Sequence, residues 1–153
     1  VMLLLGAAML LGTLAGSRDP LQPLSVLRSS AASVEARPLA FARVASLAEL
    51  ETRLAAADKP VLLDFYADWC VSCKEMERFT FADARVQARL SEWTLLQVDV
   101  TENTDADRAL LQRFGLYGPP AIVFFARGGR EITGLRVVGF QNAEEFLGLL
   151  SRI

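Results

Sequence analysis

The stretch DFYADWCVSCKEME, residues 64–77, contains both cysteines of this 153-residue chain. An apolar, β-prone run, VLL at 61–63, precedes it, and a run of helical type follows. The pattern therefore predicts that the two sulfurs lie where a strand ends and a helix begins. Free backbone N–H groups and the helix dipole favour negative charge at such a position, so Cys70 lies where a reactive thiolate is stabilised. Cys73 faces the same side of the helix, and this spacing allows a small-loop disulfide.

Composition limits the chemistry that the chain can perform. Apolar residues make up 52%, which is ample for a core of about 110 residues in one domain with a short appendage. A net charge of -2 gives no reason to expect nucleic acid or an anionic surface as partner. The chain has no histidine, which removes Ser-His and Cys-His catalysis and every histidine-ligated metal site.

The first 38 residues differ in composition from the rest. Residues 1–16, VMLLLGAAMLLGTLAG, carry no charge. As a helix they would span about 24 Å, short of the roughly 30 Å hydrocarbon core of a membrane. The favoured interpretation is the end of a transmembrane helix; a signal-peptide core and a buried core helix are the alternatives. Both of the first two place the later residues of the chain outside the cytoplasm. Residues 17–38 contain three prolines and a Ser/Ala run, which is typical of a linker.

Residues 39–153 are predicted to form one α/β domain. Hydrophobic periodicity and turn residues predict strands at 41–44, 61–66, 93–100, 121–126 and 131–139, the last two joined by a Gly128-Gly129 hairpin. Capping residues predict helices that start at Ser46, Asp83, Thr104 and Asn142, besides the helix that follows the cysteines. This order, β-α-β-α-α-β-α-β-β-α, predicts a mixed sheet with helices on both faces.

A CxxC pair occurs in several kinds of site, and the remaining sequence disfavours most of them. A zinc site needs two further ligands, and an iron–sulfur cluster usually needs four thiolates, but the chain has no other cysteine or histidine. Attachment of c-type haem requires a histidine after the second cysteine, where Lys74 stands. A purely structural disulfide fits poorly, because so small a loop removes little unfolded-state entropy. The pattern therefore favours redox exchange without a metal or a cofactor.

A second feature lies just before the strand predicted at 121–126. The run Tyr117-Gly118-Pro119-Pro120-Ala121 places proline at the strand entry, where it marks a turn. A cis X-Pro bond costs only about 0.5–1 kcal/mol and is a device of tight turns. Such a turn beside the sulfurs would present backbone to an extended partner segment.

Three segments together carry a specific family resemblance. These are DFYADWCVSCKEMERFTFAD, LLQVDVTENTDADRALLQRFGLYGPPAIVFF and RVVGFQNAEEFLGLL. They resemble the thioredoxin superfamily and, within it, the C-terminal periplasmic domains of the DsbD family of thiol:disulfide interchange proteins. The likeness covers about residues 41–150 and implies a thioredoxin fold. In that family the domain follows the last transmembrane helix, which agrees with the apolar residues 1–16 and the linker at 17–38.

The resemblance also implies roles for matched residues. Cys70 would be the exposed nucleophile, Cys73 the buried resolving thiol and Pro120 the cis-proline. Asp64 matches the buried acid beneath the active site, and Glu77 matches a second acid of this branch. Cys70 would attack a partner disulfide, and Cys73 would then resolve the mixed disulfide.

The same resemblance implies partners and a location. Family members take electrons from a membrane-domain cysteine pair and pass them to an N-terminal periplasmic domain, and then to disulfide isomerases and cytochrome c maturation factors. The location implied is the bacterial inner membrane, with this domain in the periplasm. Two alternatives remain: a dedicated cytochrome c maturation reductase, and a non-catalytic binding module whose CxxC is a static disulfide.

The two acids can also be interpreted from their positions alone. Asp64 lies in an apolar strand, where burial without a partner should raise its pKa; the alternative is a surface acid at a strand end. Glu77 lies four residues after Cys73 on the same helical face, and the alternative is a solvated charge. Carboxylates near the sulfurs oppose the thiolate, so we expect a less acidic Cys70 than in strongly oxidising CxxC proteins. Asp64 is the candidate proton acceptor for Cys73.

Three further residues carry expectations about docking. Trp69 is expected to shield the nucleophile, with plain core packing as the alternative. Lys74 is expected to be solvated rather than to assist the thiolate. Pro119 can accept but cannot donate a backbone hydrogen bond, whereas thioredoxin-like folds commonly use both groups there. We therefore predict that partner docking has one main-chain donor fewer and depends more on side-chain contacts.

Overall fold

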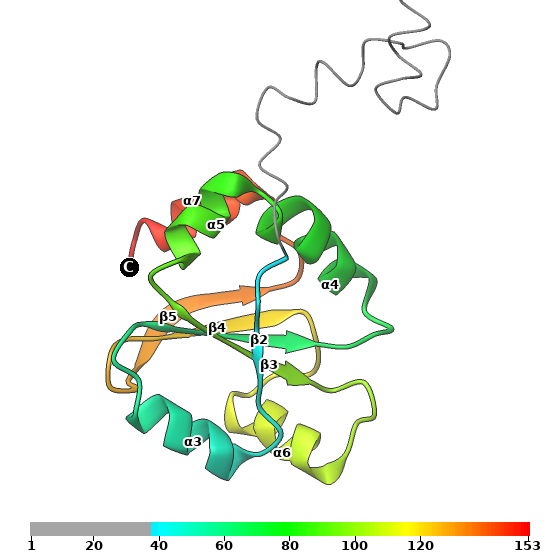
Figure 1. The fold of residues 1–153 in the computed structure, drawn as a ribbon. Helices are drawn as coiled ribbons and strands as arrows, with labels where there is room; N and C mark the ends of the chain where they lie inside the picture. The colour runs from blue at the N-terminus through cyan, green and yellow to red at the C-terminus, as the bar shows by residue number, and fades with distance from the viewer. Residues whose placement is uncertain (1–37) are drawn as a thin grey trace, which may run out of the picture. The chain divides into compact units, whose positions relative to one another are not determined.

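The computed structural model describes residues 38–153 (Figure 1). The expectations for residues 1–16 and for almost all of the linker lie outside the described residues. Within residues 38–153, no helix combines the length and the apolar character that crossing a membrane requires. The strands are β1 (Ala42–Arg43), β2 (Val61–Tyr66), β3 (Thr94–Asp99), β4 (Ala121–Phe125) and β5 (Glu131–Val138). The helices are α3 (Leu47–Ala55), α4 (Val71–Glu75), the π-helix η1 (Met76–Phe81), α5 (Ala84–Leu90), α6 (Asp105–Arg113) and α7 (Ala143–Leu150).

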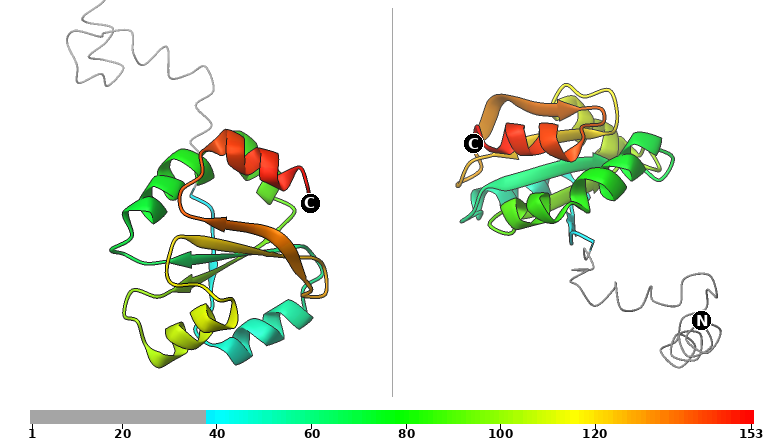
Figure 2. Two further views of the ribbon diagram at one scale, coloured as in Figure 1. Left: turned by 180° about the vertical axis from the view of Figure 1, so that it is seen from behind. Right: turned by 90° about the horizontal axis from the view of Figure 1, so that it is seen from above.

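The strands form one mixed sheet in the order β1-β3-β2-β4-β5. β1, β3 and β2 run parallel, whereas β4 and β5 add antiparallel pairs. Helices α3 and α6 cover one face, and α4, α5 and α7 cover the other (Figure 1). Figure 2 shows α7 beside α5, seen from behind and from above. The predicted mixed sheet with helices on both faces is confirmed.

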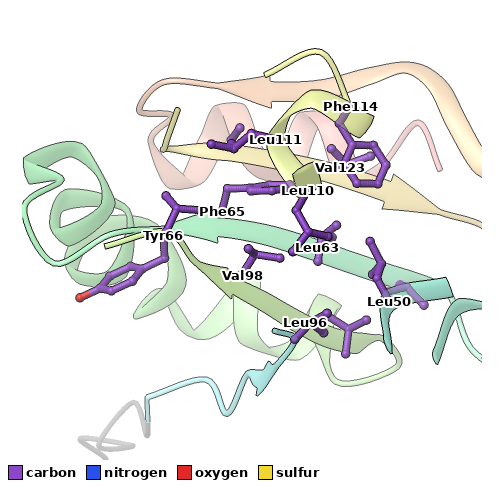
Figure 3. Close-up of a cluster of buried hydrophobic side chains, with 14 of the residues drawn as sticks. Leu50, Leu63, Phe65, Tyr66, Leu96, Val98, Leu110, Leu111, Phe114 and Val123 are labelled. Carbon is purple, nitrogen blue, oxygen red and sulfur yellow. The ribbon is translucent and has the colours of Figure 1, made fainter. Parts of the chain in front are cut away.

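Side-chain alternation along the strands builds a core on each face. In β2, Leu63 and Phe65 (Figure 3) belong, with Val61, to the buried cluster that includes residues of α3 and α6. Leu62 belongs to the second cluster, with residues of η1, α5 and α7. Successive strand residues face opposite sides, so Asp64 shares the face of Leu62. A buried Leu or Phe contributes about 1.5–3 kcal/mol, so a one-residue slip in register is strongly disfavoured.

Polar side chains define the helix starts, as the capping pattern predicted. The predicted caps each accept a backbone N–H with their side chains at a helix start: Ser46, Asp83, Thr104 and Asn142. The last two form complete capping boxes, with Asp107 and Glu145 respectively. Glu49 differs from the pattern, because its carboxylate accepts from Ala45 N, one residue before the cap. Each cap satisfies a donor that the helix itself leaves free.

Two local features refine the prediction. The helix after the cysteines does not stay α-helical, because it widens into the π-helix η1 from Met76. The hairpin at Gly128-Gly129 is confirmed, and both glycines adopt positive φ, 79° and 80°. A Cβ on Gly129 would lie 2.8 Å from the carbonyl oxygen of Leu54, so this position excludes other residues by contact as well as by conformation.

Candidate active site

The ends of two parallel strands position the candidate site. β2 and β3 are paired through Tyr66 and Asp99, and the N–H of Val100 donates to the carbonyl of Tyr66 at 2.8 Å. The segments that follow these strands, 67–70 and 100–104, therefore begin side by side at the carboxyl-terminal ends of the two strands. The first leads directly into α4, which carries Cys73.

The two cysteines form the predicted small-loop disulfide, with an S–S distance of 2.09 Å and a Cα–Cα distance of 5.3 Å. Cys70 is the N-cap of α4, and its Sγ accepts the backbone N–H of Cys73 at 3.1 Å. The bond therefore sits at the strand-to-helix junction, where free N–H groups favour a negatively charged sulfur. Within residues 38–153, no three carboxylate or thiol groups are arranged to hold a metal ion.

The expected exposure of Cys70 is wrong for this disulfide form. Cys70 is 5% exposed and Cys73 is 4% exposed, so the two cysteines are almost equally buried. The cause is the capping geometry, because the Cys70 sulfur turns toward the helix end, where it bonds both the Cys73 sulfur and the Cys73 amide. Its sequence neighbours Trp69 and Val71 are exposed instead, at 61% and 72%.

The proline turn lies beside the end of β2. The Pro119–Pro120 peptide bond is cis, as the resemblance implied. Ala121 pairs with Phe65 of β2 and belongs to the same buried cluster as both cysteines. The Pro120 carbonyl accepts the N–H of Gly139 at 3.0 Å, which ties the turn to the end of β5.

Asp64 is buried on the sheet face that α4 and η1 cover, with 6% of it exposed. Burial raises its pKa to about 7, and the nearby charge of Glu77 adds to this rise. A hydrogen bond from Gln97 Nε2 to Asp64 Oδ2, at 2.7 Å, works in the opposite direction because it favours the carboxylate. The burial of Asp64 excludes the surface-acid alternative and is the physical cause of the raised pKa that its position predicted.

Gln97 is the hydrogen-bonding partner of Asp64, and the sequence pattern did not predict it. It is 6% exposed and lies directly opposite Asp64 in the β2–β3 register. The available signal was a single amide in the apolar strand LLQVDV. A buried amide needs a hydrogen-bonding partner, and a buried acid in a neighbouring strand is a suitable one. Buried Asp64 therefore has a hydrogen-bonding partner, and this bond limits the rise in its pKa.

Glu77 is a solvated charge, which is the alternative that its position allowed. It is exposed on η1, yet its charge raises the pKa of buried Asp64. It also lines a surface pocket of about 520 Å³ together with Gln97, Arg43 and Lys74. Asp64 is therefore a buried carboxyl and Glu77 a solvated one, and the charge of Glu77 acts on Asp64.

Lys74 is exposed, as expected, but its ammonium group also contacts Tyr66 and Asp68. Its Nζ donates to the Tyr66 hydroxyl, lies 4.5 Å from the centre of the Tyr66 ring and is 3.9 Å from Asp68 Oδ1. The hydrogen bond from Lys74 to Tyr66 raises the pKa of the ammonium group. Figure 3 shows the Tyr66 ring at the edge of the buried cluster with its hydroxyl pointing away from it. Lys74 therefore contacts the last residue of β2 from the surface.

Trp69 lies at the surface, so the core-packing alternative is wrong. Its indole Nε1 donates to the backbone carbonyl of Thr101 at 3.2 Å. The N–H of Asp68 donates to Thr101 Oγ1 at 2.9 Å. Thr101 is a second residue that sequence reasoning missed, and nothing in the sequence pattern indicates these bonds, because they join segments more than 30 residues apart.

Comparison with known families identifies the class of protein. The sequence matches the thioredoxin-like domain family over residues 48–153, and the chain belongs to that family. It is similar to the oxidised C-terminal domain of Neisseria meningitidis DsbD, at 38% identity and a TM-score of 0.57, over 69% of this chain and 90% of that one. The reduced form of that domain gives 35% identity and a TM-score of 0.59, over 71% and 96%.

Longer relatives carry the same name. The chain is 55% identical to the thiol:disulfide interchange protein DsbD of Ralstonia nicotianae, over 99% of this chain and 26% of that protein. It is 48% identical to DsbD of Pectobacterium atrosepticum, over 89% of this chain and 24% of that protein. The chain thus spans about a quarter of the length of these curated relatives. The thioredoxin fold and the resemblance to DsbD C-terminal domains are confirmed.

Proposed function

We propose that this chain is a thiol:disulfide oxidoreductase that passes electrons to protein disulfides through Cys70 and Cys73. The observation that carries the proposal is the disulfide itself, placed at a helix N-terminus with its first cysteine as the cap. The cis peptide bond before Pro120, at the entry to the neighbouring strand β4, supports it. So does the similarity to proteins named for thiol:disulfide interchange.

The reaction proceeds by two exchanges of sulfur partners. In the reduced enzyme the Cys70 thiolate attacks one sulfur of the partner disulfide, forms a mixed disulfide and releases the other partner sulfur as a thiolate, which takes up a proton. Cys73 loses its proton and attacks Cys70 Sγ. The mixed disulfide then breaks, the partner leaves as a dithiol, and the Cys70–Cys73 disulfide holds the oxidising equivalents. Two electrons have moved from the enzyme to its partner.

Asp64 is proposed as the group that accepts the Cys73 proton. A carboxyl with a pKa of about 7 exchanges protons readily near neutral pH, whereas an ordinary aspartate is already fully ionised there. Glu77 and Gln97 tune this group in opposite directions, the first by charge and the second by hydrogen bonding. Asp64 and Glu77 together are proposed to make Cys70 less acidic than in strongly oxidising CxxC proteins.

The acid pair can be tested by titrating Cys70. In Asp64→Asn and Glu77→Gln variants we expect the thiol pKa of reduced Cys70 to fall, because a negative charge near the thiolate has been removed. Thiolate absorbance near 240 nm or alkylation rate against pH measures this. A conservative change at Asp58, an exposed acid in the α3–β2 loop, provides the control. An unchanged Cys70 pKa in both variants would refute the role of the pair.

Partner proteins are proposed to dock on the exposed apolar side chains around the disulfide. Trp69, Val71 and Tyr117 are exposed at 61%, 72% and 106%; two of them flank Cys70, and Tyr117 lies two residues before Pro119. Large exposed apolar side chains near a reactive group are typical of protein recognition. Because Pro119 offers no N–H, these side-chain contacts take a larger share of docking than usual.

We propose that the chain is a tethered periplasmic domain of a bacterial inner-membrane protein. Support comes from the apolar residues 1–16 and from relatives about four times as long. A membrane-domain cysteine pair would be the electron donor, and an N-terminal periplasmic domain or periplasmic thioredoxin-like proteins the acceptors. A Cys73→Ala variant expressed in cells should retain its acceptor as a mixed disulfide on Cys70, which mass spectrometry can identify.

Reduction of insulin by dithiothreitol tests the activity directly. The parental chain should accelerate the precipitation of reduced insulin, and Cys70→Ser should abolish the acceleration because no nucleophile remains. Ser72→Ala, a change inside the motif that retains both sulfurs, is the matched control and should stay active. A parental chain no faster than Cys70→Ser would instead favour a binding module with a static disulfide.

A further inference from the structure

We propose that Thr101 is a positioning residue for disulfide exchange, which holds the 67–70 loop and directs Trp69 toward the docking protein. The proposal rests on the proposed function for its kinetic consequence. Its geometric part stands on four hydrogen bonds that meet at this one residue. Thr101 lies on the segment that follows β3, more than 30 residues from the loop that it contacts.

The hydroxyl of Thr101 both accepts and donates. It accepts the backbone N–H of Asp68 at 2.9 Å and donates to Asp99 Oδ1. The backbone N–H of Thr101 donates to the same carboxylate oxygen at 3.0 Å. An ionised carboxylate only accepts, so it directs the hydroxyl proton to itself and leaves a lone pair for Asp68. Valine has the same shape as threonine but can perform neither task.

Asp99 is itself held in place from the edge of the sheet. Arg43, in β1, lies 2.8 Å from its second carboxylate oxygen. The carboxylate therefore has one oxygen for Arg43 and the other for Thr101. This arrangement fixes the rotamer of Thr101 through a partner that is not part of the disulfide loop.

The backbone carbonyl of Thr101 orients the indole of Trp69. The carbonyl accepts the indole N–H at 3.2 Å, although Trp69 is 61% exposed. An exposed indole without a fixed partner would populate several rotamers, and ordering it on binding would reduce affinity. The bond holds the polar edge of the ring, so its apolar surface is available next to Cys70. Thr101 thereby organises the loop and the side chain that precede the nucleophile.

A Thr101→Val variant should separate docking from chemistry. We expect its KM for a protein disulfide such as insulin to rise about fivefold, the factor that corresponds to one neutral hydrogen bond, with kcat within about twofold of the parental value. The rate with a small aromatic disulfide should stay within about twofold, because that substrate needs no extended docking surface. Thr101→Ser, which keeps the hydroxyl, should restore the parental KM.

A spectroscopic readout tests the geometric part without any activity. The chain has two tryptophans, so an indole N–H spectrum contains two signals. In Thr101→Val the Trp69 signal should shift or broaden, because the loop that carries it has lost its hydroxyl partner. Trp93 packs against Phe124 at 5.8 Å between ring centres, and its signal should not move. Thr101→Ala should behave like Thr101→Val, which guards against a folding defect of either variant.

Thr133→Val, on an exposed position of β5, is the matched control for removing a hydroxyl. The proposal is overturned if Thr101→Val leaves both the Trp69 signal and the insulin KM at parental values, or if Thr101→Ser fails to restore them. A parental chain that does not reduce insulin would defeat the proposed function instead, while the Trp69 signal would still report on the positioning by Thr101.

Discussion

At the scale of a residue, Asp64 links burial to protonation. The folded chain holds its carboxyl almost entirely away from water, and this raises the pKa from 3.8 to about 7. Between these two values the folded state keeps a proton that the unfolded state releases, so stability falls as pH rises through this window. The full contribution of neutral Asp64 is present below pH 4 and is lost above about pH 7. Buried Asp64 therefore opposes the stability of the folded chain at neutral pH.

The Asp64→Asn variant removes the charge and keeps the shape of the side chain. A pKa of about 7 in place of 3.8 corresponds to about 4 kcal/mol at high pH. We expect the variant to be about 2–4 kcal/mol more stable than the parent at pH 8, and nearly equal to it at pH 4. Urea unfolding of the oxidised protein at the two pH values measures the difference. Asp58→Asn should show no such pH-dependent gain, and an equal gain for Asp64→Asn at both pH values would contradict the prediction.

At the scale of an element, the π-helix η1 is tied to the loop between β5 and α7. Thr80 is fully buried, and its hydroxyl donates to the carbonyl of Gln141. The Gln141 N–H in turn donates to Met76 Sδ at 3.3 Å. Two residues earlier, Gly139 bonds to the carbonyl of Pro120. One short loop therefore connects the helix that follows the cysteines with the cis-proline turn.

The connection between η1 and the loop between β5 and α7 can be tested at Thr80. Thr80→Val keeps the side-chain volume but leaves the Gln141 carbonyl without its donor, so we expect a loss of about 1–3 kcal/mol. Thr80→Ser keeps the hydroxyl and should be less destabilised, since it loses only a methyl group. Urea midpoints at constant m-value measure both variants. If the valine variant is as stable as the serine variant, the hydroxyl bond does not contribute as proposed.

In the molecule as a whole, two hydrophobic cores supply the stability, one on each face of the sheet. The largest fully buried side chains come from strands and helices throughout residues 50–150. The disulfide joins residues only three positions apart, so it crosslinks no distant elements. The fold therefore does not depend on this disulfide to hold its elements together.

We expect the reduced protein to keep its fold. Closing a four-residue loop removes little unfolded-state entropy, so reduction should lower stability by no more than about 2 kcal/mol. The protein should still unfold in one cooperative transition in urea with excess dithiothreitol, with an unchanged m-value. Circular dichroism and Trp fluorescence should give the same midpoint. Loss of the cooperative transition on reduction would show that the bond is structural.

Local patterns in the sequence predicted most of the fold. Strand alternation placed Leu62 and Leu63 on opposite faces, and polar caps marked four helix starts, because both depend on residues close in sequence. The π-helical turn from Met76 escaped prediction, since its contacts with Gln141 bridge 65 positions. For the same reason the partners of Asp64 and Trp69, Gln97 and Thr101, were not foreseen.

The cysteine spacing, the strand-to-helix junction that holds it and the proline turn could all be predicted from residues close together in the chain. The burial of Cys70 and the neighbours that set the pKa of Asp64 arise only when the chain folds. Burial and hydrogen bonding depend on side chains that the sheet brings together from strands far apart in the chain. Those distances in space cannot be obtained from distances along the sequence.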